Sequence, residues 1–388
     1  MEPKSIGILG STGSIGRSAL DVITAHPGRF EVKVLAAHSN VELLEEQYFR
    51  FRPETVCVVD CQKAPMLETK LKGEPVEVLS GEEALVKAAG SGGLDLVLNA
   101  VVGSAGLKAS LAAVEFGTDL ALANKESLVA GGPLFPSLLK KSGANILPVD
   151  SEHSAVWQAL AAGKEPEIKK IILTASGGPF RDLPMEKMAS VTVEQALDHP
   201  TWKMGPKITI DSSTLVNKGL EVIEAVVLFS VPAEKVQVVV HPQSIVHSMV
   251  EYIDSSIIAQ LSSPDMRLPI SYALFWPERV ESDFGRLDLT QSHSLTFEAP
   301  DFERFPALKI AYQVADVGGT APAVFNAANE EAVAAFLDRR ITYMDITEMI
   351  SRTLDELEIV TDPDLNDILA ADDRARKLCR KHSEAAQC

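Results

Sequence analysis

The chain has 388 residues, of which 46% are apolar and 23% are charged, as expected for a soluble globular protein of two or three domains. Its formal net charge of −18 argues against nucleic acid or an anionic membrane as the main partner, because both require a basic surface. Any anionic ligand must therefore meet positive groups that are concentrated at one place.

The cysteines and the first residues indicate a reducing compartment. The cysteines lack the C-x-x-C spacing of zinc sites and are too few for a disulfide scaffold, so we expect reduced thiols at Cys57, Cys61, Cys379 and Cys388. The sequence shows no basic leader and no apolar segment long enough to span a bilayer. We expect a cytoplasmic protein or a mature organellar one.

The first predicted elements are a buried strand at residues 5–9 and a helix, separated by a glycine-rich turn. The turn reads Gly10-Ser-Thr-Gly-Ser-Ile-Gly16, and apolar residues follow it at helical spacing. Such a turn lets backbone N–H groups approach a pyrophosphate at the helix N-terminus. The sequence therefore predicts a dinucleotide cofactor, although the spacing is G-x-x-G-x-x-G and a glycine turn without a ligand is the alternative.

The second predicted strand, residues 32–37, bears on the choice of cofactor. Sites for NAD usually place an acidic residue after this strand, where it binds the ribose 2′-hydroxyl. Here the sequence offers His38, Ser39 and Asn40, which are neutral donors. This pattern favours NADP over NAD.

Further strands at 55–59, 94–100, 119–123 and 145–149 alternate with helices, as expected of a parallel sheet. Asn124-Lys125-Glu126 follows one of these strands, at the edge of the sheet where ligands bind. A lysine beside a carboxylate there could meet the nicotinamide or a substrate. The alternative is a solvent-exposed ion pair.

A second acidic motif, Asp150-Ser-Glu-His153, follows the strand at 145–149. In an extended segment Asp150 and Glu152 would project to the same side and repel each other unless a cation lay between them. Together with Glu221 they could form an all-oxygen site for Mg²⁺ or Mn²⁺. The alternative is a helix start, with Asp150 or Ser151 as N-cap and Glu152 in the first turn.

Beyond residue 150 the regular alternation ends. A strand at 171–173 precedes the turn Thr174-Ala-Ser-Gly-Gly-Pro-Phe180, which could present N–H groups and a hydroxyl to an anion or be only a turn. The segment His199 to Gly205 lacks periodicity, and we interpret it as a lid in which Trp202 covers a ligand. Trp202 could equally be a core residue.

The residues that follow the lid carry a dense set of polar groups. We expect a helix to begin near Ser212, Ser213 and Thr214, whose hydroxyls could cap it, and to place Asn217, Lys218 and Glu221 on one face. Hydroxyls and a lysine at a helix start suit a phosphate, whereas a carboxylate requires a cation. The pattern suggests a phosphorylated substrate with a metal-bound head group. The alternative is a capped surface helix.

The remaining pattern predicts three domains. We expect a dinucleotide-binding, Rossmann-type domain at 1–149, an α+β catalytic domain at 150–281 and a helical domain at 307–388, with a polar linker at 282–306. Strands at 236–240, 247–252 and 256–261 could pair across a dimer. Helices are expected at 307–314, 321–337 and 346–357, followed by an exposed or frayed end.

Taken together, these motifs resemble the 1-deoxy-D-xylulose 5-phosphate reductoisomerase family over nearly the whole chain. The matching segments are Gly10 to Gly16, Ala123 to Leu128, Asp150 to His153, Ala175 to Phe180, His199 to Trp202, Asn217 to Glu221, His241 to His247, Pro264 to Arg267 and Asn326 to Glu330. The resemblance implies an NADPH-dependent oxidoreductase of non-mevalonate isoprenoid biosynthesis and a homodimer.

The resemblance also implies the roles of individual residues. A divalent cation (Mg²⁺, Mn²⁺ or Co²⁺) would be bound by Asp150, Glu152 and Glu221, beside the catalytic residues Lys125 and His153. NADPH would contact Thr12, Gly13, Ser14, Ile15, His38, Ser39, Asn40, Asn124, Glu126 and Gly205, although many relatives carry glycine at the position of His38. The sugar phosphate would contact Lys125, Ser151, Glu152, Ser176, His199, Trp202, Ser212, Asn217, Lys218 and Glu221.

The chemistry implied is a rearrangement of 1-deoxy-D-xylulose 5-phosphate, by retroaldol and aldol steps, followed by hydride transfer to give 2-C-methyl-D-erythritol 4-phosphate. Two other functions compete with it. An aspartate-semialdehyde dehydrogenase needs a central nucleophilic cysteine, and none lies between Cys61 and Cys379. A regulator that senses NADP(H) would not need three carboxylates and a phosphate site.

Overall fold

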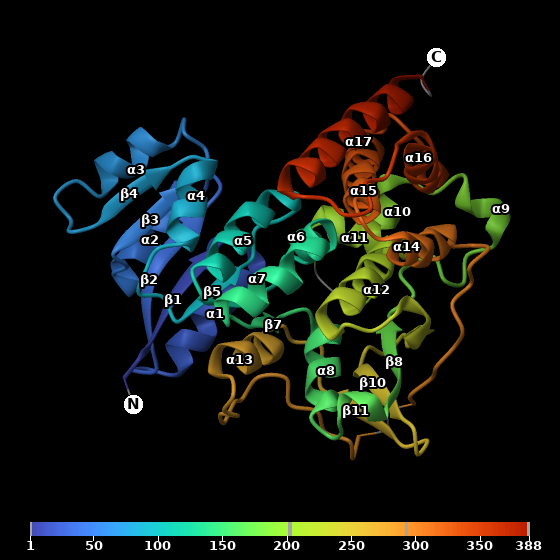
Figure 1. Cartoon of the computed structure of the whole chain (residues 1–388), viewed down its shortest axis with the longest axis horizontal. Helices are drawn as coiled ribbons and strands as arrows, with labels where there is room; N and C mark the ends of the chain where they lie inside the picture. Colours follow the sequence, from blue (N-terminus) through green and yellow to red (C-terminus); the bar gives the residue numbers. More distant parts are fainter. Residues whose placement is uncertain (1, 201–203, 292–293, 386–388) are drawn as a thin grey trace. The chain divides into compact units, whose positions relative to one another are not determined.

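The computed structural model describes residues 2–200, 204–291 and 294–385. The chain divides into two compact units, each assembled from separate segments. Unit 1 contains residues 1–127, 135–154 and 265–285, and unit 2 contains residues 128–134, 155–264 and 286–388. Figure 1 labels the elements in chain order, from β1 in blue to α17 in red.

Unit 1 is built on a seven-stranded sheet in the order β4-β3-β2-β1-β5-β6-β7, and every described pair of strands is parallel. The strands are β1 (Lys4–Leu9), β2 (Phe30–Ala37), β3 (Thr55–Val58), β4 (Glu77–Ser80), β5 (Leu96–Asn99), β6 (Asp119–Leu122) and β7 (Ile146–Pro148). The helices are α1 (Ser14–Ala25), α2 (Val41–Phe51), α3 (Ala64–Lys70), α4 (Glu82–Ala89), α5 (Leu107–Glu115), the first turn of α6 (Lys125–Gly131), α7 (Phe135–Ser142) and α13 (Arg267–Phe275).

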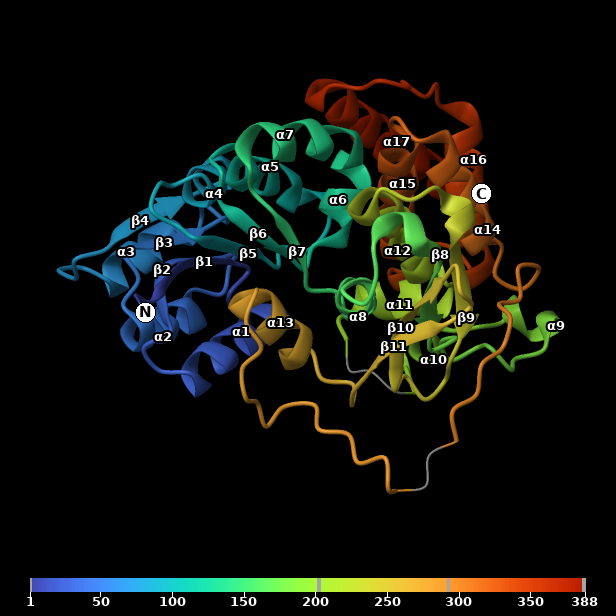
Figure 2. The ribbon, with the colours of Figure 1, turned by 60° about the horizontal axis from the view of Figure 1, so that its bottom comes forward.

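The strand order reverses at β1, and this reversal places helices on both faces of the sheet. Crossovers between parallel strands are right-handed, so α1 and α2 cover one face while α4, α5 and α7 cover the other. Figure 2 shows this arrangement, with α13 on the side of α1. The predicted Rossmann-type sheet is thereby confirmed. The short strand β4 was not predicted. Its two end residues, Glu77 and Ser80, are polar and exposed, so it lacks the apolar run of a buried strand.

Unit 2 contains a mixed four-stranded sheet in the order β11-β10-β8-β9. The pair β8/β9 is parallel, whereas β10 is antiparallel to both β8 and β11. The strands are β8 (Ile168–Ala175), β9 (Val236–Val240), β10 (Val246–Tyr252) and β11 (Ile257–Leu261). The helices are the later turns of α8 (Ser151–Leu160), then α9 (Met185–Met188), α10 (Val193–Leu197), α11 (Pro206–Ser213), α12 (Val216–Phe229), α14 (Pro306–Val317), α15 (Ala321–Leu337), α16 (Tyr343–Glu356) and α17 (Leu365–Ala385).

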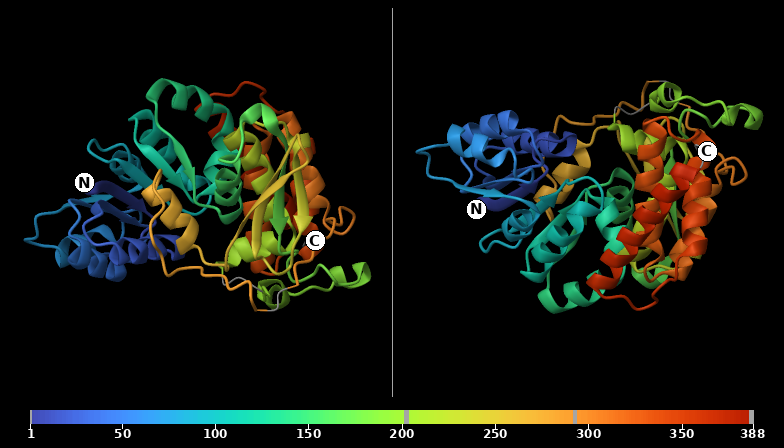
Figure 3. Two further views of the ribbon diagram at one scale, coloured as in Figure 1. Left: turned by 90° about the horizontal axis from the view of Figure 1, so that it is seen from below. Right: turned by 90° about the horizontal axis from the view of Figure 1, so that it is seen from above.

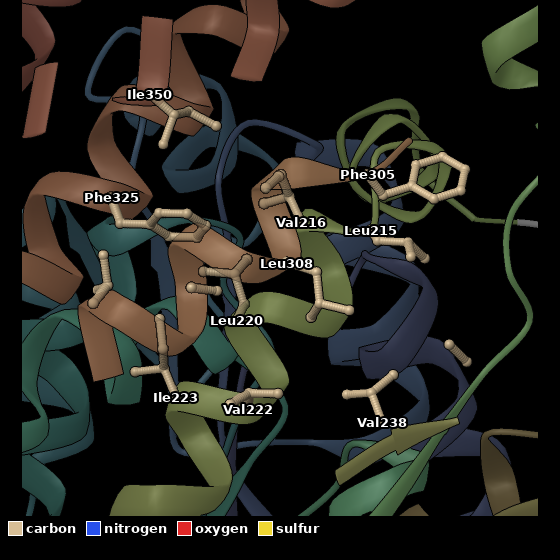
Figure 4. Packing of buried hydrophobic residues seen from close by; sticks show 14 of the residues in the cluster. Leu215, Val216, Leu220, Val222, Ile223, Val238, Phe305, Leu308, Phe325 and Ile350 are labelled. Atoms are coloured by element: carbon tan, nitrogen blue, oxygen red, sulfur yellow. The ribbon is translucent and has the colours of Figure 1, made fainter. Parts of the chain in front are cut away.

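One apolar core joins this sheet to the helices of unit 2. Figure 3 shows the strands on one side of the unit and the C-terminal helices on the other. Between them lies α12, whose Leu220 packs in the same cluster as Leu308 of α14 and Phe325 of α15 (Figure 4). Helices were expected at 307–314, 321–337 and 346–357, and α14, α15 and α16 confirm them.

The segment between α13 and α14 forms no helix or strand element in the residues described there, apart from an isolated bridge between Val240 and Glu298. A buried histidine holds it beside the sheet. The Nε2 atom of His241 accepts hydrogen bonds from the N–H groups of Ile245 (3.2 Å) and Val246 (3.1 Å), so Nδ1 carries the proton and donates to the carbonyl of Thr296 (2.9 Å). The first histidine of the motif His241 to His247 is therefore structural.

The C-terminal end was expected to be exposed or frayed; Arg374, Lys377, Arg380 and Lys381 are exposed, but fraying was wrong. Residues 365–385 form the helix α17, which packs on α15. Arg376 lies at this contact and pairs with Glu330 (2.7 Å) and Asp372 (2.6 Å), while the apolar stripe of α17 is made of Ile368, Ala371, Ala375 and Cys379. Across the described residues, every helix is too short or too polar to cross a lipid bilayer.

The close approach of α12 and α14 yields a stability prediction. A Cβ added to Gly219 would lie 2.6 Å from the Cβ of Ala311. Overpacking of this kind costs about 1–3 kcal/mol, and the better helix propensity of alanine offsets about 0.5–1 kcal/mol. Gly219→Ala should therefore lower the free energy of unfolding by about 1–2 kcal/mol, measured from urea transitions.

Two further variants control this experiment. Gly92→Ala adds the same methyl group where no atom lies within 4 Å, and should leave the urea midpoint almost unchanged. Adding Ala311→Gly to Gly219→Ala removes the clash and should restore part of the lost stability. A Gly219→Ala variant as stable as the parent would show that the two helices separate without cost.

Candidate active site

The glycine-rich turn after β1 has the geometry of a dinucleotide site. Gly10 has a φ of +81°, and a Cβ on it would lie 2.6 Å from the carbonyl oxygen of Ala100, at the end of the adjacent strand β5. A Cβ on Gly16 would lie 2.3 Å from the carbonyl oxygen of Gly10. Gly13 precedes α1, and no side chain in the described part of the chain caps this helix start. The turn therefore presents backbone N–H groups of Ser14 and Ile15 to an anion, which fits a pyrophosphate.

The residues after β2 are those expected beside the adenosine ribose. His38 and Asn40 are exposed, and Ser39 is partly buried. Asn40 is also the N-cap of α2, because its side-chain oxygen accepts a hydrogen bond from the N–H of Leu43 at 3.1 Å. None of these three side chains is acidic, which keeps the position open to a 2′-phosphate.

Asn124, Lys125 and Glu126 follow β6 and are all buried. The Asn124 amide donates to the carbonyl of Gly103 (2.8 Å), and its oxygen accepts from the N–H of Ser127 (2.8 Å). Lys125 Nζ lies 2.5 Å from Asp150 Oδ2, and the two side chains are 8% and 12% exposed. The alternative of a solvent-exposed ion pair in Asn124-Lys125-Glu126 is therefore wrong, because Lys125 and Glu126 are both buried.

The motif Asp150 to His153 begins a helix and is not extended. Asp150 is the N-cap residue of α8, and its carbonyl accepts from the N–H of Ser154 at 2.8 Å. The interpretation that Asp150 and Glu152 share the face of a strand was wrong, because β7 already ends at Pro148. The helix start that was the alternative is what forms. A helix start favours acidic side chains such as those of Asp150 and Glu152, because the helix dipole is positive there.

Short contacts fix these carboxylates within unit 1. Ser151 Oγ donates to Glu152 Oε2 at 2.6 Å. His153 is fully buried, and its Nδ1 lies 3.8 Å from Asp150 Oδ2. Carboxylate oxygens are the ligands that Mg²⁺ and Mn²⁺ prefer, so Asp150 and Glu152 fit one side of a divalent cation site.

In unit 2 the expected helix begins at Val216, just after Thr214, whose hydroxyl accepts a hydrogen bond from the N–H of Val216 at 3.4 Å, but the expected capping by Ser212 and Ser213 was wrong. Pro206 starts an earlier helix, α11, which ends at Ser213, and α12 begins at Val216 after Leu215 in the left-handed region. The Ser213 hydroxyl donates to the carbonyl of Ile210 at 2.7 Å instead of capping a helix. The signal that could have shown this is the proline, which is favoured in the first turn of a helix.

The predicted polar face of α12 is confirmed. Asn217 Nδ2 donates to Glu221 Oε1 at 2.6 Å, and Lys218 Nζ forms an ion pair with Glu221 Oε2. Lys218 and Glu221 are 3% and 1% exposed. This burial excludes the alternative of a capped surface helix. Charged side chains are rarely buried unless they are paired, as these two are.

A second polar cluster lies beside the end of α11 and joins three predicted residues. His199 Nε2 lies 3.1 Å from Ser176 Oγ and 3.1 Å from Ser212 Oγ. Burial lowers the pKa of His199, so its imidazole is neutral at pH 7. Two hydroxyls around one imidazole nitrogen form a compact set of hydrogen-bonding groups for a phosphate.

Two further residues of the predicted lid are Trp202 and Gly205. Trp202 lies outside the described residues. Gly205 is the exposed N-cap position of α11. Asp211 and Tyr343 are buried beside this cluster and were not predicted from the sequence. For Asp211 the local signal was its spacing from Lys207, four residues earlier in α11, with which it pairs at 2.8 Å.

Three family models match the chain over most of its length. A family model for 1-deoxy-D-xylulose 5-phosphate reductoisomerase matches residues 6–132, a model for the C-terminal domain of that enzyme matches residues 146–229, and a DXP reductoisomerase C-terminal domain model matches residues 261–378. The 1-deoxy-D-xylulose 5-phosphate reductoisomerase of Chlorobaculum tepidum is 54% identical over 378 residues, which are 97% of this chain and 99% of that protein.

Two solved structures are similar over almost the full length. The enzyme from Zymomonas mobilis in complex with NADPH has a TM-score of 0.93 and 46% identity, and the match covers 99% of this chain and all of that one. A DOX-P reductoisomerase in complex with NADPH, fosmidomycin and magnesium has a TM-score of 0.94 and 42% identity, with 98% of each chain covered.

The lowered pKa of His199 predicts a pH dependence of stability. Burial disfavours the charged imidazole in the folded state, so this contribution to stability is fully present above the unfolded pKa near 6.5 and is lost as the pH falls through the lower folded pKa. Replacing His199 with Asn removes the titrating group. The loss of stability between pH 7.5 and pH 5, followed by urea midpoints, should then be smaller in His199→Asn than in the parent. Equal losses would mean that His199 titrates normally.

Proposed function

The chain belongs to the 1-deoxy-D-xylulose 5-phosphate reductoisomerase family, and we propose how its residues bind and convert the substrate. The protein is an NADPH-dependent oxidoreductase that also requires a divalent cation, and it converts 1-deoxy-D-xylulose 5-phosphate to 2-C-methyl-D-erythritol 4-phosphate in isoprenoid biosynthesis. The observation that carries this conclusion is the match of three family models and of close relatives along nearly the entire chain.

We propose that NADPH binds along the edge of the sheet in unit 1. The N–H groups of Thr12, Gly13, Ser14 and Ile15 would bind the pyrophosphate at the start of α1. His38, Ser39 and Asn40 would lie at the ribose 2′-phosphate, and Asn124, Glu126 and Gly205 would line the remainder of the site. The tight glycine turn and the neutral side chains after β2 support this proposal.

The phosphate of the substrate would be bound in unit 2 by Ser176, His199, Ser212, Asn217 and Lys218. The described contacts support this role, because two hydroxyls meet at the His199 ring and Lys218 supplies a buried positive charge. In a chain of net charge −18, such a local arrangement of donors is what an anion requires.

The cation would be bound by Asp150 and Glu152 of unit 1 together with Glu221 of unit 2. All three are carboxylates held by hydrogen bonds or ion pairs within their own units, which reduces the ordering needed when an ion binds. Ser151 orients Glu152, and His153 lies against Asp150. Lys125, paired with Asp150, would orient the head group of the sugar.

When bound, NADPH supplies the hydride and the cation supplies Lewis-acid polarisation of substrate oxygens. The protein's residues position the reaction. The phosphate contacts anchor one end of the substrate, and Lys125 and the carboxylates fix the other, so that rearrangement and reduction occur in one orientation.

We also propose a homodimer that works in the cytoplasm. β11 is an edge strand of its sheet, and its Ile257 and Ile258 are 52% and 38% exposed, as expected of an edge that pairs with a second copy. Three cysteines of the described part of the chain, Cys57, Cys61 and Cys379, are free thiols, which agrees with a reducing compartment.

The function is tested by following NADPH absorbance after addition of 1-deoxy-D-xylulose 5-phosphate. Absorbance should fall with Mg²⁺ or Mn²⁺ present and stay constant with a chelator. Glu221→Gln should lower turnover by at least a hundredfold, because it removes one charged ligand of the cation while leaving a side chain of the same shape.

The affinity for NADPH, followed by fluorescence, should be the same in Glu221→Gln and the parent. Turnover that persists in the chelator would contradict a role of the cation. Full activity of Glu221→Gln would contradict the assignment of Glu221 alone.

A second variant addresses the phosphate. Lys218→Ala should raise the KM for the sugar phosphate by about tenfold to hundredfold, because a hydrogen bond to a charged group contributes roughly 1.5–3 kcal/mol. Lys169→Ala removes an equal charge from an exposed pair with Glu251 in the same unit and serves as the control. If both variants raise KM equally, the effect is one of net charge and the phosphate lies elsewhere.

A further inference from the structure

Asp211 is a buried carboxylate in the residue that precedes Ser212, and no substrate contact has been assigned to it. Its side chain is 1% exposed. Within α11 it pairs with Lys207 at 2.8 Å, and Oδ1 accepts a hydrogen bond from Asn329 Nδ2 of α15 at 2.9 Å. The last turn of α11 is thereby attached to a helix that lies 118 residues further along the chain.

Tyr343, the first residue of α16, makes a second attachment at the same place. Its hydroxyl donates to the carbonyl oxygen of Ser213 at 2.6 Å, which satisfies one of the carbonyls left unpaired at the end of α11. Its ring packs edge to face against Phe180, with the centroids 5.2 Å apart. Phe180 belongs to the turn that carries Ser176. One tyrosine therefore contacts both segments that present hydroxyls to His199.

The turn that carries Ser176 and the end of α11 also pack closely against each other. A Cβ on Gly178 would lie 2.8 Å from the carbonyl oxygen of Ser212, so the turn after β8 and the end of α11 are in close contact. Their common support is the surface formed by α15 and α16.

We propose that Tyr343, together with the Asp211–Asn329 hydrogen bond, is a positioning residue for the phosphate-binding hydroxyls of Ser176 and Ser212. This inference rests on the proposed function, in which these hydroxyls bind the substrate phosphate. Loss of the Tyr343 hydroxyl would leave the carbonyl of Ser213 without its donor, and the last turn of α11 would then relax away from His199. The C-terminal helices thus set the affinity for the phosphate without touching the substrate.

The test uses Tyr343→Phe in the full-length protein, since this change removes one oxygen and keeps the ring. The KM for 1-deoxy-D-xylulose 5-phosphate and the inhibition constant of inorganic phosphate should each rise by about twofold to tenfold, which is the effect of one hydrogen bond. The kcat at saturation should change by less than about twofold, because the groups that act on the sugar head are not displaced.

Tyr312→Phe is the matched control. Tyr312 of α14 is also largely buried in unit 2, and its hydroxyl donates to the carbonyl oxygen of Val236 at 2.8 Å, in the sheet. Both variants should lose a similar amount of stability, but only Tyr343→Phe should alter phosphate affinity. In a Ser212→Ala background, Tyr343→Phe should have a smaller effect on KM, because the hydroxyl that it positions is already absent.

Equal KM values for Tyr343→Phe and Tyr312→Phe would overturn the inference. It would also be overturned if Tyr343→Phe raised KM by the same factor with and without Ser212→Ala. The parent protein could consume NADPH when the sugar phosphate is added, while Tyr343→Phe has the same KM as the parent. That result would refute this inference and leave the proposed function intact. A parent protein that neither turns over nor is inhibited by inorganic phosphate refutes the proposed function and the inference with it.

Discussion

Two buried ion pairs, Lys125 with Asp150 and Lys218 with Glu221, are the constraint on which the candidate site depends. A buried charge without a partner is strongly unfavourable, so each unit can hold its reactive groups in a dry environment only by pairing them internally. Each lysine thereby offsets the charge of one buried carboxylate within its own unit. In the proposed function, a dication and a phosphate would bring opposite charges to these pairs, so the lysines and carboxylates would meet a charged ligand as well as each other.

The backbone beneath these pairs is arranged to place polar groups at helix ends. Asp150 and Glu152 stand at the start of α8, the glycine turn opens α1, and Ser212 lies in the last turn of α11. Helix ends carry unpaired N–H and C=O groups, and they are therefore the positions where a fold can bind ions at little cost. The sheet in unit 1 and the apolar core in unit 2 serve to hold these ends in place.

The sequence predicted the order of strands and helices well, because apolar residues recur with clear periods in elements such as β1 and α12. It also predicted that Lys218 and Glu221 share a face. It failed where two local structures compete for the same short polar residues: Ser212 and Ser213 suit a helix start as well as a helix end, and tertiary packing decides. Helix α17 was missed because alanines make up much of its apolar stripe. The bond between Asp211 and Asn329 joins distant residues and has no local signal.

The interleaved composition of the two units has a consequence for biosynthesis. The face of the unit 1 sheet beneath α1 is completed by α13, and the core of unit 2 includes α15, which is buried on nearly all sides. A ribosome must therefore release most of the polypeptide before either unit can reach its native packing. Truncated products that end near residue 260 would lack both α13 and α15 and would expose apolar surface in each unit.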